Sequence, residues 1–81
     1  MPSRRSPYPA WIHTRRTELG LRIATLRHQA ALSQDQLASR AGMDRRSIQR
    51  YEAAVRDPRY ADLLLIAHAL EVPLTDLLRE D

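Results

Sequence analysis

Apolar residues recur along this chain at intervals of three and four positions, which is the spacing of one face of an α-helix. The first stripe of this kind consists of Leu19, Ile23, Leu26 and Ala30. It predicts a helix that begins after Thr14 and ends near Ala30, weakened a little by a glycine within it. A start at Pro9 is an open alternative, because proline suits a first helical turn and this start adds Ile12 to the stripe.

A second, shorter helix has a well-marked start and end. Ser33 and Gln36 stand three positions apart, so each side chain can bond the backbone N–H of the other in a capping box. This pair predicts a helix from Gln34 to about Ala41. Gly42 then supplies the left-handed conformation that commonly ends a helix. The positions expected to face inward are Leu37, Ala38 and Ala41.

Three more helices follow along the chain. Asp44 is the expected cap of a helix from Arg45 to about Ala53, which buries Ile48 and Tyr51. A connecting loop then leads to a fourth helix at about 59–70 and a short fifth helix at about 73–79, with a proline in its first turn. In these last two helices the residues expected to face the core are Leu63, Leu64, Ile66, Ala67, Leu70, Leu74, Leu77 and Leu78.

The predicted fold class is all-α, with five helices and short connections. No stretch has the alternating pattern of a strand, and no internal repeat is visible. The second helix, the turn at 42–44 and the third helix form a helix-turn-helix. Residues 14–81 are expected to make up this domain. Residues 1–13 hold prolines and arginines and are expected to be a flexible basic arm.

Charge is unevenly distributed along the chain, whose formal net charge is +3. All 13 cationic side chains are arginine. Residues 1–17 carry four of them and no acid, whereas residues 60–81 carry one arginine and five acids. The first two-thirds would therefore attract a polyanion, and the last third would repel one. If the polyanion is DNA, the basic arm would follow the backbone or minor groove through Arg4, Arg5, Arg15 and Arg16.

The sequence offers little for catalysis or for a cofactor. Cysteine is absent, which excludes disulfides and cysteine-based zinc sites and fits a reducing cytosol. His13, His28 and His68 lie far apart, and no glycine-rich phosphate loop is present. No apolar run approaches the roughly 20 residues that cross a membrane. We therefore expect a cytoplasmic protein that is not an enzyme and binds neither metal nor cofactor.

The second and third helices carry a motif: Leu32-Ser33-Gln34, Leu37-Ala38, Ala41-Gly42-Met43, Ile48 and Tyr51-Glu52. With the apolar spacing of the flanking helices, it resembles the phage repressor and Cro-type helix-turn-helix family over about residues 18–78. The resemblance implies the lambda-repressor-like fold. It also implies a bacterial, nucleoid-associated transcriptional regulator, commonly a repressor, that binds double-stranded DNA. Three positions depart from the family pattern: Glu71 replaces a helix-ending glycine, Arg59 a capping serine, and Leu65 a polar residue.

The resemblance also implies how DNA is read. If the third helix buries its apolar face, its other face carries Arg45, Arg46, Gln49 and Arg50, which are the expected base contacts in the major groove. Arginine in that strip favours guanine. Gln34 is expected to bond a phosphate at the start of the second helix. Further phosphate candidates are Ser33, Arg40, Arg56 and Arg59. An ion pair between Arg27 and Glu52 is expected to hold the third helix at its angle.

Homodimerisation is expected, because one module covers too few base pairs for useful specificity. The expected interface lies in the acidic, leucine-rich last third of the chain, at Leu65, Leu74 and Leu78. An alternative has Leu65 packed under Trp11 of the same chain, in a protein that is monomeric without DNA. A second functional interpretation also stays open, a protein-interaction module of the same fold such as an antitoxin bound to its toxin or a transcriptional bridging factor.

Overall fold

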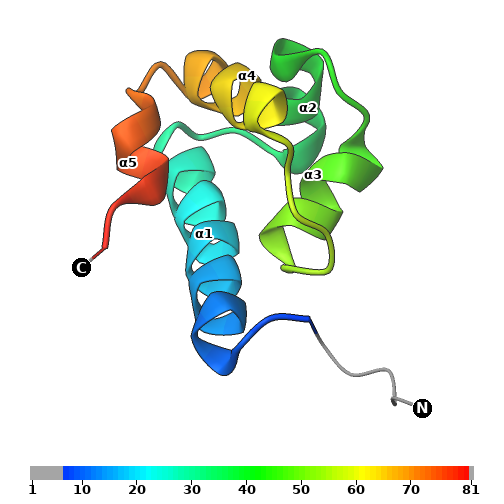
Figure 1. The fold of residues 1–81 in the computed structure, drawn as a ribbon. Coiled ribbons are helices and arrows are strands. Elements are labelled where there is room, and N and C mark those ends of the chain that lie inside the picture. Colours follow the sequence, from blue (N-terminus) through cyan, green and yellow to red (C-terminus); the bar gives the residue numbers. More distant parts are fainter. Residues whose placement is uncertain (1–6, 81) are drawn as a thin grey trace.

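A computed structural model describes residues 7–80, and within this range it contains five α-helices and no strand (Figure 1). The helices are α1 (Ala10–Gln29), α2 (Gln34–Ala41), α3 (Arg45–Glu52), α4 (Tyr60–Leu70) and α5 (Leu74–Leu78). The predicted all-α fold is confirmed, and the ends of α2 and α3 lie within one residue of the predicted ones. None of the helices in the described range is both long and apolar enough to cross a membrane.

The start of α1 differs from the main prediction. Its first residue is Ala10 and Pro9 is the N-cap, so a start after Thr14 is wrong and the alternative near Pro9 is close. Proline fits here because its missing N–H is one that the first turn of a helix leaves unpaired. Residues 10–13, expected in the arm, are therefore helical, while residues 1–6 lie outside the described part of the chain.

The helix-turn-helix is fixed at its joints by local hydrogen bonds. Ser33 Oγ accepts from the Gln36 N–H at 3.0 Å, and Gln36 Oε1 accepts from the Ser33 N–H at 2.8 Å, which confirms the capping box. Gly42 ends α2 with a φ of +73°. Asp44 Oδ1 accepts from the Ser47 N–H at 2.8 Å and caps α3. These bonds set where α2 ends and α3 begins.

The end of α4 has a strained residue. Glu71 has a φ of +60°, in the left-handed region that favours glycine. The N–H groups of Glu71 and Val72 donate to His68 O and Ala67 O, both at 3.0 Å, and close the last turn. The side chain of Glu71 therefore stands where the sequence pattern predicted a helix-ending glycine.

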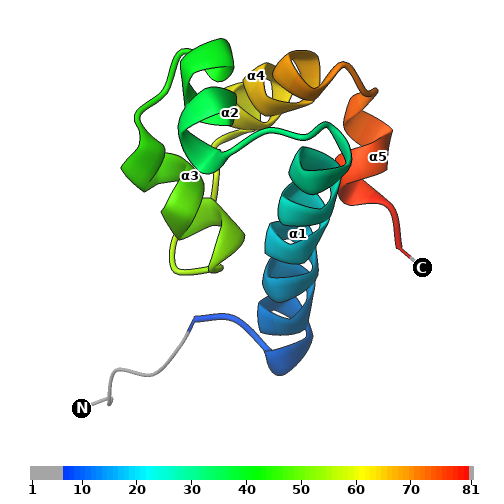
Figure 2. The same ribbon diagram turned by 180° about the vertical axis from the view of Figure 1, so that it is seen from behind.

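All five helices meet in one core. Each contributes one fully buried aliphatic side chain, and these are Ile23, Leu37, Ile48, Ile66 and Leu77. Helix α1 packs against α3 and α5, while α2 packs against α3 and α4. Seen from opposite sides in Figures 1 and 2, α3 and α5 lie on different sides of α1. This arrangement leaves the outer face of α3 clear of α5.

Two leucines that were expected in the core are exposed. Leu64 is 43% and Leu78 is 48% exposed. In α4 the buried residues Ile66, Ala67 and Leu70 define one face, and at about 100° per residue Leu64 falls on the opposite side. Helix α5 has a single turn, and only Leu77 of its leucines is directed fully into the core. The prediction was wrong for these two positions because periodicity does not show which face is covered.

Candidate DNA-binding surface

Helix α3 presents a basic face to solvent and an apolar face to the core. Ile48 and Tyr51 are 0% and 7% exposed. The residues on the exposed side are Arg45, Arg46, Gln49 and Arg50. A hollow of about 460 Å³ is lined by Asp44, Arg45, Arg46 and Gln49. The four residues expected to contact bases thus lie together on the solvent face of one short helix.

Charged groups surround the N-terminus of α3, where Asp44 is the cap. Donation by the Ser47 backbone N–H lowers the pKa of the Asp44 carboxyl, and the charges of Arg46 and Arg50 act in the same direction. The carboxylate lies where the helix dipole favours negative charge. Arg45 Nε is 3.8 Å from Asp35 Oδ1, and because both side chains are exposed, this pair restrains Arg45 only weakly.

A buried ion pair joins α1 to the end of α3. Arg27 Nε and Nη2 donate to the two Glu52 carboxylate oxygens at 2.7 and 3.0 Å, and Arg27 Nη1 donates to Leu32 O at 2.9 Å. The hydrogen bond to Glu52 raises the pKa of Arg27 above its ordinary value. Such a pair adds little net stability, but removing one partner is costly because the other is left buried and unpaired. It therefore fixes geometry more than it adds stability.

Gln34 belongs to the same hydrogen-bond network. Its Nε2 donates to Glu52 Oε1 at 2.9 Å, which ties the first turn of α2 to the last turn of α3. The side chain expected to bind a phosphate is thus already oriented in the free protein. One amide N–H bonded to Glu52 leaves the second N–H of the same group for another acceptor.

Two further contacts on α3 were not predicted from the sequence. The Tyr51 hydroxyl donates to Asp62 Oδ2 at 2.5 Å, and burial together with this bond raises the pKa of Tyr51. Gly20 of α1 lies against the backbone of α3, where an added Cβ would be 2.8 Å from Tyr51 O and still closer to Glu52 O. A glycine inside a helical stripe was the available indication of such a close approach.

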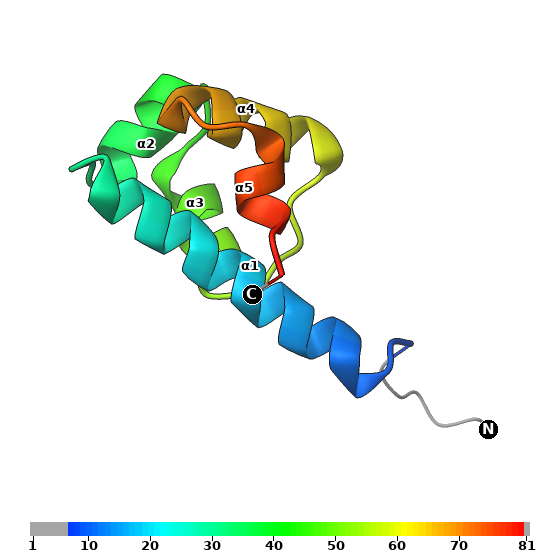
Figure 3. The same ribbon diagram turned by 90° about the vertical axis from the view of Figure 1, so that its left-hand side faces the viewer.

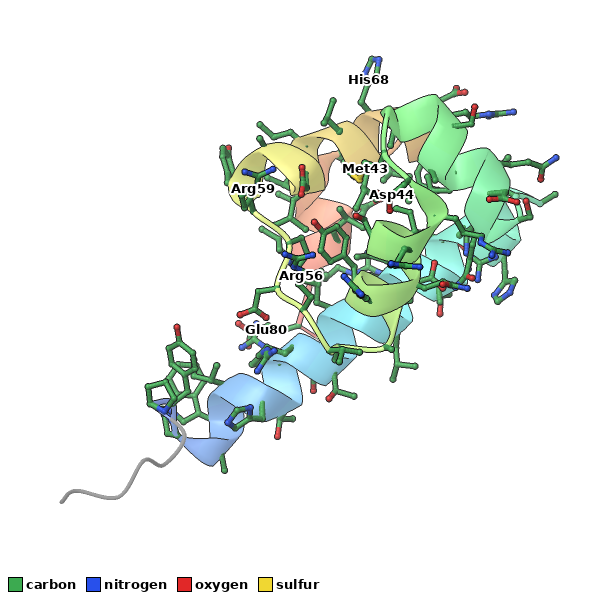
Figure 4. The ribbon with its side chains drawn as sticks, turned by 90° about the vertical axis from the view of Figure 1, so that its right-hand side faces the viewer. Met43, Asp44, Arg56, Arg59, His68 and Glu80 are labelled. Carbon is green, nitrogen blue, oxygen red and sulfur yellow. The ribbon has the colours of Figure 1, made fainter. Side chains whose placement is uncertain are left out.

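The remaining candidate phosphate contacts are spread around the helix-turn-helix. Arg56 and Arg59 border a polar cleft of about 520 Å³ between α3 and the start of α4, which Met43 and Asp44 also line (Figure 4). Arg59 Nε is 3.9 Å from Asp62 Oδ2, and its side chain is otherwise open to solvent. The other two candidates belong to the ends of α2: Arg40 is exposed in its last turn, and Ser33 is its N-cap.

The arginines assigned to the arm fall into two groups. Arg15 and Arg16 lie in α1 and are paired with acids from distant parts of the chain. Arg15 Nη2 is 2.9 Å from Glu80 Oε2, and Arg16 Nε is 2.6 Å from Asp57 Oδ1. These pairs tie both side chains to the folded domain. Arg4 and Arg5 lie outside the described residues.

The three leucines expected in a dimer interface do not line one hollow. Leu65 is 45% exposed and borders the cleft beside Arg59. Trp11 lies in the first turn of α1, which extends away from α4, so Leu65 does not pack under Trp11 (Figure 3). Leu78 borders a separate groove between α1 and α5, and Leu74 is half-buried against the core.

No group of three or more His, Asp or Glu side chains within residues 7–80 is arranged to hold a metal ion.

The family described as helix-turn-helix domain matches residues 18–80 of the chain. Among solved structures, the restriction-modification controller protein C.AhdI from Aeromonas hydrophila is 31% identical, with a TM-score of 0.74 over 75% of this chain and 92% of that one.

Two other solved structures share the fold at lower identity. The hypothetical transcription factor NHTF from Neisseria is 23% identical, with a TM-score of 0.78 over 95% of this chain and 87% of that one. The clp gene regulator ClgR from C. glutamicum is 21% identical, with a TM-score of 0.74 over 78% of this chain and 82% of that one. No curated protein matches the sequence.

Proposed function

The chain belongs to the helix-turn-helix domain family of DNA-binding regulators, and we propose that it is a transcriptional repressor that reads the major groove of double-stranded DNA with α3. The observation that carries this proposal is the exposed strip on α3. The strip consists of Arg45, Arg46, Gln49 and Arg50. The opposite face of the same helix is buried, and its C-terminal end is held by Arg27, Gln34 and Asp62.

Base recognition follows from the chemistry of the strip. An arginine fork donates two parallel hydrogen bonds to O6 and N7 of guanine, and each such pair contributes about 1–3 kcal/mol of discrimination. Arg45 and Arg46 occupy the first turn of α3, the part of a recognition helix that reaches base edges. Three arginines in one strip therefore favour a half-site that contains guanine.

Phosphate contacts position this helix on the duplex. Gln34 lies in the first turn of α2, where unpaired backbone N–H groups and the helix dipole favour an anion. Arg56 and Arg59 lie at the cleft between α3 and the start of α4. Arg40 and Ser33 complete the proposed set. These contacts fix orientation without reading sequence.

The protein acts as a homodimer in this proposal, because one helix-turn-helix covers only part of a useful operator. Two copies related by a two-fold axis would place their α3 helices in successive major grooves about 34–36 Å apart. The interface expected from the sequence comprises Leu65, Leu74 and Leu78. The protein would act in the bacterial cytoplasm, at the nucleoid. The similarity to a restriction-modification controller supports a role in gene control.

Salt dependence distinguishes this proposal from a protein-interaction module such as an antitoxin or a bridging factor. Affinity for a labelled duplex is measured by fluorescence anisotropy over a range of salt concentrations. DNA binding by an arginine strip weakens steeply with salt, because each phosphate contact releases counterions. Arg59→Ala, which removes a proposed phosphate contact, should flatten this dependence. Arg22→Ala, on the α5 side of α1, should not when a half-site duplex is used. Absence of salt-dependent DNA binding would favour the interaction module.

A further inference from the structure

The side of α1 that is turned toward α5 carries an apolar surface that the core does not cover. A groove of about 400 Å³ runs between the two helices, and its apolar lining includes Ile12 and Leu78. Leu19, which packs against the core, and the buried Leu77 also line it. A second hollow of about 280 Å³ shares Glu18 and Arg79 with the groove and continues to Leu21, which is 61% exposed. We call this continuous surface the α1–α5 face.

The beginning of α1 projects from the body of the protein beside this groove. Helix α1 has 20 residues, and the molecule measures 47 × 28 × 19 Å along its principal axes. Figure 3 shows the first turns of α1 extending beyond the other helices. Trp11 on this tip is 62% exposed, and Tyr8, just before it, is 51% exposed. Large apolar side chains gathered on one exposed surface are characteristic of a protein interface, and aromatic ones are enriched there.

The charges around the α1–α5 face indicate which partner fits. Arg15 Nε is 3.3 Å from Glu18 Oε1, and Arg15 Nη2 is 2.9 Å from Glu80 Oε2. Arg79 also lines the groove, so cations and anions alternate along its rim. An interface between two identical copies must be complementary to itself. This mixed rim meets that requirement. The arginine strip on α3 does not meet it, because the like charges of the two strips in a pair would repel each other.

We propose that two copies of the chain pair through the α1–α5 face, with Trp11 of each copy inserted in the groove of the other beside Leu78. This inference rests on the proposed homodimer and assigns its surface, which excludes Leu65. Because α5 and α3 lie on opposite sides of α1, pairing here leaves both arginine strips free for DNA (Figures 1 and 2). The projecting tip, which is solvent-exposed in one copy, becomes part of a shared apolar layer in the pair.

Trp11 is the only tryptophan in the chain, so its fluorescence reports directly on this contact. The emission of the full chain is recorded without DNA while its concentration is varied, and the oligomeric state is followed by sedimentation velocity. We expect a blue shift of Trp11 emission that coincides with dimer formation. Leu78→Glu should abolish both the shift and the dimer. Leu65→Glu, a matched change at an equally exposed leucine outside the face, should leave both unchanged.

Circular dichroism of each variant separates loss of pairing from loss of folding. Leu21→Glu, on the same face but outside the groove, is a second variant expected to weaken the dimer. A dimer that forms without any change in Trp11 emission would overturn the assignment. So would a dimer that survives Leu78→Glu and Leu21→Glu but is lost with Leu65→Glu, or a native chain that stays monomeric even on DNA. The affinity of the native chain for a half-site duplex is measured separately, so failure of the proposed DNA binding is distinguishable from failure of this interface.

Discussion

Gly20 of α1 lies directly against the backbone carbonyl of Glu52, the last residue of α3. No side chain fits between the two helices at this point, since a Cβ on Gly20 would also be 2.8 Å from Tyr51 O. The carboxylate of the same Glu52 pairs with Arg27, seven residues further along α1. Helix α3 is thus held at its C-terminal end through both backbone and side chain, while the arginines of its first turn face solvent.

Replacing Gly20 with alanine should destabilise the protein although alanine is the better helix former. The propensity gain is about 1 kcal/mol. The added methyl group meets backbone rather than a flexible side chain, and overpacking of this kind costs about 1–3 kcal/mol or more. We expect a lower urea midpoint for Gly20→Ala. Thr25→Ala, at an exposed position of α1, should change stability by less than about 0.5 kcal/mol. A stabilised Gly20→Ala variant would show that α1 and α3 are not in close contact.

Glu71 should be replaceable by glycine with a gain in stability. A residue with a Cβ in the left-handed conformation costs about 1–2 kcal/mol, and the flexibility of glycine in the unfolded chain offsets part of the relief. We expect Glu71→Gly to be more stable by about 0.5–1 kcal/mol in urea unfolding. Glu71→Ala is the matched control, because it removes the charge but keeps the Cβ. Equal gains in both variants would attribute the effect to charge instead of backbone strain.

The sequence was sufficient at the joints of the helix-turn-helix, because their features depend on neighbouring residues. The capping box of α2, the left-handed Gly42 and the Asp44 cap each involve groups within five residues, and all three are present. The outward strip on α3 could be read from the positions of Ile48 and Tyr51 because a short amphipathic helix has only one way to bury its apolar face.

Where the partner is distant along the chain, the pattern of residues alone was insufficient, and the pair between Arg27 and Glu52 was expected only from the family resemblance. Gly20 was interpreted only as a weak point of its helix, because the backbone that approaches it comes from α3. Arg16 was assigned to a DNA-contacting arm, whereas it pairs with Asp57, 41 positions away. Leu64 and Leu78 were placed in the core because apolar residues alone do not reveal which side of a helix receives a neighbour.

Asp44 makes stability depend on acid pH. Its pKa in the folded state is lowered, chiefly by the hydrogen bond from the Ser47 N–H, whereas the pKa of an unfolded aspartate is about 3.9. The contribution of this cap is therefore complete above the unfolded value and is lost as pH falls through the folded one. Asn caps a helix without titrating, so Asp44→Asn should flatten the decline in urea midpoint below about pH 4. Parallel pH curves for the two proteins would argue against a role for the Asp44 charge.

The basic arm should contribute to affinity through charge. Removing residues 1–6 deletes Arg4 and Arg5 but keeps the Pro9 cap of α1. We expect weaker DNA binding and a salt slope that is shallower by up to about 2, because each phosphate contact contributes about 0.9. Replacing only Arg4 and Arg5 with alanine in the full-length chain should reproduce this result. If the truncated protein keeps the slope of the full chain, the arm does not contact DNA.

Selection of bound duplexes from random DNA by the native chain and by three variants, Arg45→Ala, Arg46→Ala and Gln34→Ala, tests the reading role of α3 most directly. The native chain should enrich a guanine-containing half-site repeated with two-fold symmetry. Arg45→Ala should lose about 1–3 kcal/mol of affinity and relax the preference at one position of the half-site. Gln34→Ala should weaken all sequences nearly equally, because the contact proposed for Gln34 is to a phosphate and carries no base preference. If Arg45→Ala and Arg46→Ala both keep full affinity and an unchanged base preference, α3 is not the reading helix.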